Sequence, residues 1–227
     1  MAKPNLALVG GVDADEFAAE KGAFHTSLTE TARILKLGQA LSAGRFAAVA
    51  TRLPNSDNFL LGRIEPDETP EISGIAAVSP AGSTDNVAAP LAPLFAAMFD
   101  AQPEAQAVAI FRGHRLAVWA AAGRPLPVAY FQMLGYTKAK EIPVSPVDAE
   151  QLRATVIRNQ DAPAVLLEDG SAVVWTKDAD KLARFIISLE EAAYVTGLAE
   201  RIGGAKPYPD AVRSLIQDSL QAQTRLA

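Results

Sequence analysis

The chain has 227 residues, of which 49% are hydrophobic and 21% are charged. This composition is typical of a globular protein with a packed core, and the length favours one large domain over two small ones. Its 21 Lys and Arg against 26 Asp and Glu give a net charge of −5. Because an acidic chain without a basic stripe does not attract phosphate groups, we expect neither nucleic acid nor an anionic membrane as a partner.

Two residue types that often carry catalysis or bind metals are scarce. The chain has no Cys, and its two His are His25 and His114. Disulfides, thiol catalysis and cysteine metal sites are therefore excluded, as is a zinc or iron centre held by three imidazoles of one chain. The longest apolar stretch, residues 87–99, contains two prolines and is too short to cross a bilayer. With no basic leader at the start either, the expected compartment is the cytoplasm.

The first part of the chain predicts an arm, one helix and several short strands. Residues 1–24 show no sustained periodicity and are interpreted as an N-terminal arm. Ser27 followed by Glu30 fits a capping box, and an apolar stripe from Leu28 onwards predicts a helix that Gly44 closes. Strand-compatible segments follow at 46–53, 59–61 and 72–78, with a proline-bounded loop at 64–70.

Helices and strands alternate in the rest of the chain. The run 107–112 is apolar enough for a central strand, and Gly170 lies in a turn between strands at 165–167 and 172–175. One helix is expected to begin at residue 90 or 92 and to end at 99. Further helices are expected at 116–122, 128–134, 151–159, 178–202 and 209–220, and one more short strand at 142–144. This alternation predicts an α/β fold with a mixed sheet between helices, in a single domain at residues 25–227.

Polar residues gather at the end of the predicted central strand. His114 follows this strand, with Arg112 and Arg115 beside it, and strand ends in α/β folds often line sites. The alternative is that His114 is a solvated loop residue. His25 comes just before a predicted helix and is interpreted as a cap-region residue.

Several other conspicuous residues have a structural interpretation. Trp119 and Trp175 lie in apolar segments, so we expect core residues rather than ligand-stacking groups. Glu190 and Glu191 are adjacent on a helix and point in different directions, so they cannot form a paired-carboxylate site and are expected to be solvated. Tyr208 lies between two prolines, which hold its phenol either toward a neighbouring subunit or in a packed turn.

Several stretches, taken in order along the chain, resemble the class II aldolase/adducin family. They are Ala-Thr-Arg-Leu-Pro at 50–54, residues 99–108 with Pro-Glu at 103–104, Ala-Ala-Ala-Gly-Arg-Pro-Leu-Pro at 120–127, Val-Leu-Leu-Glu-Asp-Gly at 165–170 and Leu-Glu-Glu-Ala-Ala at 189–193. The resemblance covers residues 27–204. It implies a three-layer, fuculose-phosphate aldolase-like fold, with a mainly antiparallel central sheet flanked by helices on both faces. It also implies a closed homo-oligomer, which we expect to be a tetramer.

The zinc chemistry of this family does not carry over to the chain. The resemblance places the zinc-binding His-x-His of the family on Ile-Phe-Arg at 110–112, and its third His on Asp169. The acid/base Glu falls near Leu91, and the phosphate-binding Gly-Asn-x-Ser falls on Ala-Ala-Val-Ala at 47–50, which lacks side-chain donors. Because two histidines cannot form a three-histidine site, we expect no metal and no other cofactor.

Two functions from different classes remain open. One is a metal-independent lyase, isomerase or decarboxylase that acts on a small carbonyl or hydroxy compound, with Arg112 or His114 as the electrophile. Its candidate catalytic residues are Arg112, His114 and Asp169. The other function, favoured by the apolar replacements at family positions, is a non-catalytic role in binding or assembly. Candidate residues for binding a substrate or other small molecule are Arg124, Glu168 and Tyr208.

A contact between Arg112 and Asp169 is the sharpest prediction of the resemblance. Both residues replace side chains that converge on one cation in the family, so their heads should lie within reach of each other. A guanidinium supplies a fixed positive charge and binds a carboxylate through two bonds. The contact then either neutralises the former metal position or binds a small-molecule ligand.

Overall fold

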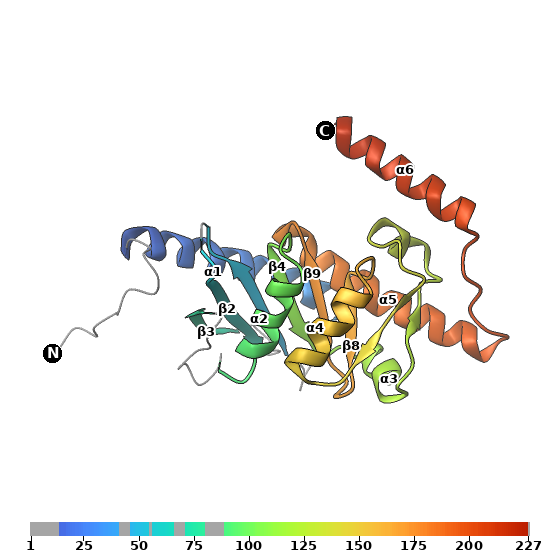
Figure 1. Cartoon of the computed structure of the whole chain (residues 1–227), viewed down its shortest axis with the longest axis horizontal. Helices are drawn as coiled ribbons and strands as arrows, with labels where there is room; N and C mark the ends of the chain where they lie inside the picture. The colour runs from blue at the N-terminus through green and yellow to red at the C-terminus, as the bar shows by residue number, and fades with distance from the viewer. Residues whose placement is uncertain (1–13, 41–45, 55, 66–70, 80–88, 227) are drawn as a thin grey trace.

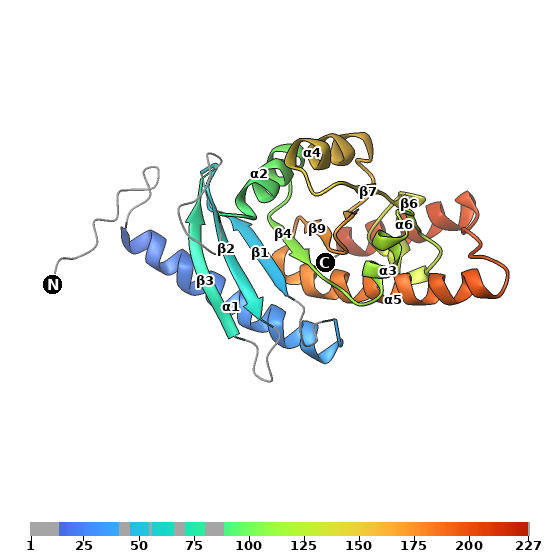
Figure 2. The ribbon, with the colours of Figure 1, turned by 90° about the horizontal axis from the view of Figure 1, so that it is seen from below.

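The computed structural model describes residues 14–40, 46–54, 56–65, 71–79 and 89–226. These residues form a seven-stranded sheet with helices on both faces (Figure 1, Figure 2). The strands, in spatial order, are β3 (Glu71–Val78), β2 (Phe59–Glu65), β1 (Ala47–Arg52), β4 (Ala107–Phe111), β9 (Ala172–Thr176), β8 (Ala164–Leu167) and β7 (Val144–Ser145). Neighbouring strands are antiparallel except β7 and β8, which are parallel. The predicted mixed, mainly antiparallel sheet is confirmed.

The helices form the two outer layers. On one face of the sheet, α1 (Ala14–Leu37) packs with α5 (Leu182–Arg201), and on the other α2 (Ala92–Ala101) packs with α4 (Ala149–Arg158) (Figure 2). Smaller or outlying elements are α3 (Leu116–Ala121), α6 (Asp210–Leu226), the 3-10 turns η1 (Phe131–Gly135) and η2 (Ala179–Lys181), and the paired strands β5 (Leu126–Pro127) and β6 (Glu141–Ile142). Helix α6 extends away from the layers (Figure 1). None of the described helices has the length and apolar character that crossing a bilayer requires.

The central strand β4 separates two hydrophobic cores. All five of its side chains are buried. Ala107, Ala109 and Phe111 face the core that α1 and α5 cover, whereas Val108 and Ile110 belong to the core that α2 and α4 cover. Because successive side chains of a strand point to opposite faces, a strand covered on both faces is apolar at every position. Burial on both faces therefore explains why the sequence of β4 is apolar at every position.

The first helix begins earlier than predicted. It starts at Ala14 instead of residue 27, and Phe24 is buried in the core between this helix and the sheet. The predicted arm at 1–24 is therefore helical from residue 14 onwards, while residues 1–13 lie outside the described part of the chain. His25 is an exposed residue inside the helix and not a cap-region residue. Phe17 and Phe24 are seven residues apart, about two helical turns, so both reach the core from one face.

Other boundaries also differ from prediction. Strand β2 continues through residues 64–65, where a loop was expected, because its pairing with β3 extends to Glu71. In place of the predicted helix at 128–134 the chain forms the short 3-10 turn η1. The last helix runs on to Leu226. Gly44, the predicted end of the first helix, lies outside the described residues.

Both tryptophans are core residues, as predicted. Trp119 is 5% exposed and Trp175 is 8% exposed. The indole N–H of Trp119 donates to the carbonyl of Ala193 at 3.0 Å, which satisfies the polar end of the buried ring. This bond ties α3 to α5.

Candidate functional site

The end of strand β4 places Arg112 at the edge of the sheet. Phe111, the last residue of the strand, pairs with Ala47 of β1 and with Ala172 of β9, so the sheet holds the strand from both sides. The N–H of Arg112 then donates to the carbonyl of Phe46 at 3.1 Å. The sheet therefore fixes the backbone of Arg112, while its side chain leaves the core and is 40% exposed.

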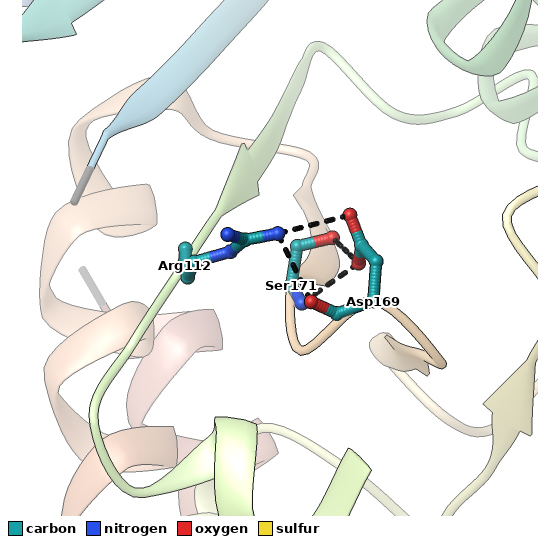
Figure 3. Close-up of polar contacts among 3 residues, drawn as sticks. All are labelled: Arg112, Asp169 and Ser171. Carbon is teal, nitrogen blue, oxygen red and sulfur yellow. Dashed lines mark hydrogen bonds and ion pairs between the residues drawn. The ribbon is translucent and has the colours of Figure 1, made fainter. Parts of the chain in front are cut away.

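Arg112 contacts Asp169 in the turn between β8 and β9 (Figure 3). Its Nη2 donates to the carbonyl oxygen of Asp169 at 3.0 Å and lies 3.3 Å from the carboxylate oxygen Oδ2. The Asp169 side chain is 41% exposed. The Nε of Arg112 is buried and has no hydrogen-bond partner among the described residues. The predicted contact between these two residues is confirmed.

The sequence of the turn explains the position of Asp169. Gly170 adopts φ +87°, a left-handed conformation that glycine takes without steric cost. The second carboxylate oxygen of Asp169, Oδ1, accepts the N–H of Ser171 at 2.9 Å and its hydroxyl at 2.6 Å. Ser171 is 2% exposed, so these bonds satisfy two buried donors. Each oxygen of the Asp169 carboxylate thus accepts from a neighbour, and the catalytic role predicted for Arg112 and Asp169 stays a prediction.

Two other predicted site residues lie in the loops that carry this contact. His114 is exposed in the loop between β4 and α3, two residues after Arg112. Glu168 is also exposed, and its N–H donates to the carbonyl of Ser145 at 3.1 Å, directly before Asp169. Their predicted roles, catalysis for His114 and ligand binding for Glu168, stay predictions.

The remaining two predicted site residues have their contacts elsewhere. Arg124 forms an ion pair with Glu200 at 3.2 Å, and its guanidinium lies 5.4 Å from the ring centre of Trp119. Tyr208 packs edge-on against Phe131, with 6.4 Å between ring centroids. Neither set of contacts involves the β4 end, and the assignment of both residues to ligand binding stays a prediction.

Sequence reasoning missed Glu190, for which the prediction of a solvated residue is wrong. Glu190 is 3% exposed. Its Oε2 accepts the N–H of Arg115 at 3.1 Å and its Oε1 accepts the N–H of Leu116 at 3.2 Å. These amides lie at the start of helix α3, where the first N–H groups have no hydrogen-bond partner within the helix. A signal was present, because Glu190 lies four residues after Ile186 and three before Ala193, both on the buried face of α5.

Glu191 turns to a different neighbour, as its adjacency to Glu190 on one helix predicts. It is half-buried and accepts the hydroxyl of Tyr130 at 3.1 Å. Desolvation by burial, followed by the contact with the Glu191 carboxylate, raises the pKa of Tyr130 above its usual value of 10.0. The two carboxylates therefore do not form a paired site.

The side chains at the β4 end do not fit the zinc ion that the resemblance implies. Ile110 and Phe111 are apolar and are 2% and 1% exposed. Arg112 is a cation, and Asp169 offers a single carboxylate that already accepts hydrogen bonds. Zinc sites take three or four His, Cys, Asp or Glu ligands. Within the described ranges, no group of three or more such residues is placed to hold a metal ion.

A family model identifies the wider relationship. The Class II Aldolase and Adducin N-terminal domain matches residues 58–196, which include β4, the contact between Arg112 and Asp169, and most of α5. The chain belongs to the class II aldolase/adducin family. The resemblance found in the sequence is thus confirmed, and Arg112, Asp169 and Glu190 all lie within the matched part of this family member.

Solved structures confirm the class II aldolase fold. An L-fuculose 1-phosphate aldolase is 12% identical over 92% of this chain and 98% of that chain, with a TM-score of 0.68. An L-fuculose 1-phosphate aldolase from Glaciozyma antarctica PI12 is 16% identical over 92% of this chain and 85% of that chain, with a TM-score of 0.67. An aldolase II superfamily protein from Pseudomonas syringae is 16% identical over 93% of this chain and 87% of that chain, with a TM-score of 0.65. Identities this low establish the fold and carry no residue roles. No curated protein sequence matches the chain.

Proposed function

We propose that this class II aldolase/adducin family member is a metal-independent, non-catalytic protein that binds a small carboxylate at Arg112. The observation that carries the proposal is the contact of Arg112 with Asp169. The sheet fixes the backbone of Arg112, and 40% of its side chain is exposed. A guanidinium held in this way binds a carboxylate through two parallel N–H···O bonds, so a small carboxylate is the ligand that suits it best.

The contact with Asp169 is compatible with such a ligand. The Nη2–Oδ2 distance of 3.3 Å is longer than the about 2.8 Å of a strong charge-assisted bond. A ligand carboxylate can therefore replace Oδ2, while the carbonyl of Asp169 keeps its own bond to Nη2. Asp169 retains both bonds to Ser171 in either state.

The surroundings of Arg112 support binding more than catalysis. The contact supplies a directed positive charge, but the Asp169 carboxylate is already an acceptor for Arg112 and Ser171. Of the two positions on which the histidines of the family's zinc-binding His-x-His fall, Ile110 is buried and apolar and Arg112 is a cation. A site of this kind holds an anion without itself moving a proton.

Calorimetric titration with acetate and glycolate tests the proposal. The wild-type protein should bind at least one of them saturably, Arg112→Ala should abolish the binding, and Arg112→Lys should weaken it at least tenfold because an ammonium cannot form the paired bonds. Arg153→Ala is the matched control, since Arg153 also forms an exposed ion pair with an aspartate, Asp100. Unchanged binding by Arg112→Ala, or no saturable binding by the wild type, would overturn the proposal.

A metal-independent lyase or isomerase is the second candidate, and the position of His114 favours it. An exposed imidazole two residues after Arg112 can take a proton from the carbon beside a carbonyl, and the electron pair then moves to the carbonyl oxygen. The Arg112 guanidinium would stabilise the resulting enolate oxygen. Deuterium incorporation into dihydroxyacetone in D2O, followed by NMR, tests this candidate. Enzyme-dependent incorporation that His114→Ala removes would establish it.

We further propose a homo-oligomer, expected to be a tetramer, in the cytoplasm. Large apolar side chains on the second half of α5 and on the residue that follows it support assembly, because exposed apolar surface commonly marks an interface. Those that are substantially exposed are Tyr194, Val195, Leu198 and Ile202, at 50%, 42%, 43% and 89%. Sedimentation equilibrium should give a multiple of 23.9 kDa, and a mass of one chain over a wide concentration range would contradict assembly. Fractionation of the producing cells tests the compartment.

A further inference from the structure

Glu190 is a charged side chain buried beneath the loop that carries Arg112. It is 3% exposed. A carboxylate removed from water needs hydrogen-bond donors in place of the water that it has lost. The donors are the N–H groups of Arg115 and Leu116, at 3.1 and 3.2 Å, with one group on each oxygen. This two-point contact fixes the plane of the carboxylate relative to the loop backbone.

Gly113 allows the carboxylate to come this close. A Cβ at this position would lie 1.7 Å from Oε1 of Glu190 and 2.4 Å from its Cδ. Real Cβ contacts essentially never fall below 3.0 Å, so any side chain at residue 113 would displace the carboxylate or the loop. Glu190 therefore packs against the loop backbone at Gly113 as well as at the two amides.

The loop is short enough for this contact to affect Arg112. Only residues 112–115 separate the end of β4 from the start of α3. The sheet holds the first end through the bond from the Arg112 N–H to Phe46, and Glu190 holds the second end. A shift of the backbone at Gly113 must be taken up within these few residues, and Arg112 is the immediate neighbour.

We propose that Glu190 is a positioning residue whose carboxylate sets the conformation of residues 112–115 and thereby places the Arg112 guanidinium for its ligand. The inference rests on the carboxylate-binding function proposed above. It also assigns a reason to a buried charge that the packing of α5 against the sheet does not require.

A role confined to fold stability predicts a different behaviour. Helix α3 is attached to α5 a second time, through the bond from the Trp119 indole to Ala193 at 3.0 Å, and Leu116 is fully buried. The loss of the Glu190 carboxylate should therefore loosen the loop and leave α3 in place. Weakening the Trp119 bond should lower stability and leave the loop as it is.

Three substitutions separate these two roles. Glu190→Gln keeps the shape but offers one acceptor oxygen to two N–H donors and places an amide NH2 against the other. Gly113→Ala perturbs the same contact from the side of the loop. Trp119→Phe is the matched control, because it removes the other hydrogen bond between α3 and α5 and keeps an aromatic ring.

The affinity for glycolate, measured by calorimetry on the full chain, is the first readout. Glu190→Gln and Gly113→Ala should each weaken binding at least tenfold, whereas Trp119→Phe should stay within twofold of the wild type. Unchanged affinity in Glu190→Gln and Gly113→Ala, while Arg112→Ala abolishes binding, would overturn the positioning role and leave the proposed function intact. An equal loss of affinity in Trp119→Phe would also overturn it.

A second readout needs no ligand and keeps the inference testable if glycolate does not bind. The Nε–H signal of Arg112 in the 1H–15N NMR spectrum, assigned with Arg112→Lys, reports on the surroundings of the guanidinium. Glu190→Gln or Gly113→Ala should shift this signal, and Trp119→Phe should not. If Glu190→Gln does not fold, the effect of Gly113→Ala on this signal tests the positioning role by itself. A signal unchanged by the folded variants would show that Glu190 does not position Arg112, whatever the protein binds.

Discussion

Unfolding measurements can separate the ion pair of Arg112 and Asp169 from the turn that it touches. The two side chains are 40% and 41% exposed, with 3.3 Å between Nη2 and Oδ2. Exposed pairs couple by about 0.2–1 kcal/mol, since water and salt screen the charges. Arg112→Ala also loses the bond to the Asp169 carbonyl, so its total cost to the free energy of unfolding should be about 1–1.5 kcal/mol.

Asp169→Ala should cost more than Arg112→Ala, because it also affects Ser171. The N–H and hydroxyl of Ser171 both donate to Oδ1 of Asp169, and Ser171 is 2% exposed. A buried donor left without an acceptor costs about 1–3 kcal/mol, so we expect a loss of about 2–4 kcal/mol. Asp169→Asn keeps one side-chain oxygen as an acceptor and should lie near 1 kcal/mol.

Urea unfolding of the three variants and of the double variant Arg112→Ala/Asp169→Ala measures these costs and their coupling. All proteins should be compared at one concentration, because assembly would make apparent stability depend on concentration. A coupling energy above about 2 kcal/mol would contradict the screened pair assumed here. An Arg112→Ala variant as unstable as Asp169→Ala would likewise show that Arg112 serves the fold, and would remove the basis for a ligand site.

Three further predictions concern other polar groups, of which Arg213 is buried and Arg52 and Tyr130 are half-buried. Arg52→Met should lower the free energy of unfolding by about 2–4 kcal/mol. The reason is that the Arg52 guanidinium donates to the carbonyl of Phe99 near the end of α2 and to a second carbonyl nearby. A loss under about 1 kcal/mol in urea unfolding would contradict this prediction. Arg213→Met should speed hydrogen exchange in α6 but not in α5. Arg213 is 5% exposed and donates to two carbonyls outside α6, so it attaches this helix to the rest of the domain. Equal effects on both helices would be inconsistent with that attachment. The raised pKa of Tyr130 means that the folded state holds its phenol proton more tightly than the unfolded state. Its contribution is therefore complete below pH 10.0 and is lost as the pH rises through the folded value, so Tyr130→Phe should flatten the alkaline decline in stability, and an unchanged decline would refute the assignment.

The central strand and the Arg112–Asp169 contact could be predicted from the sequence. A strand covered on both faces is apolar throughout, and β4 shows this pattern without exception. The turn at Gly170 is equally local, because only glycine adopts its positive φ at little cost. The resemblance to the family then predicted that Arg112 and Asp169 lie together, although they are 57 residues apart in the chain.

The helical spacing of α5 places Glu190 on the buried face, but the partners of its carboxylate and the start of α1 could not be predicted from local pattern. The burial of Glu190 depends on two amides of a loop about 75 residues earlier and on the missing side chain of Gly113. Pairwise geometry of this kind leaves little trace in the sequence of either segment. In the first turns of α1, small and charged residues separate the apolar ones, so the apolar stripe is weak in the sequence. The packing of Phe24 in the core shows that this part of α1 belongs to the folded domain.

The most direct test of a carboxylate site that needs no metal is a calorimetric titration of glycolate, before and after exhaustive dialysis against a chelator. The proposed site at Arg112 predicts the same dissociation constant in both samples, with one glycolate bound per chain. Binding that disappears after chelation and returns when zinc is added would contradict it.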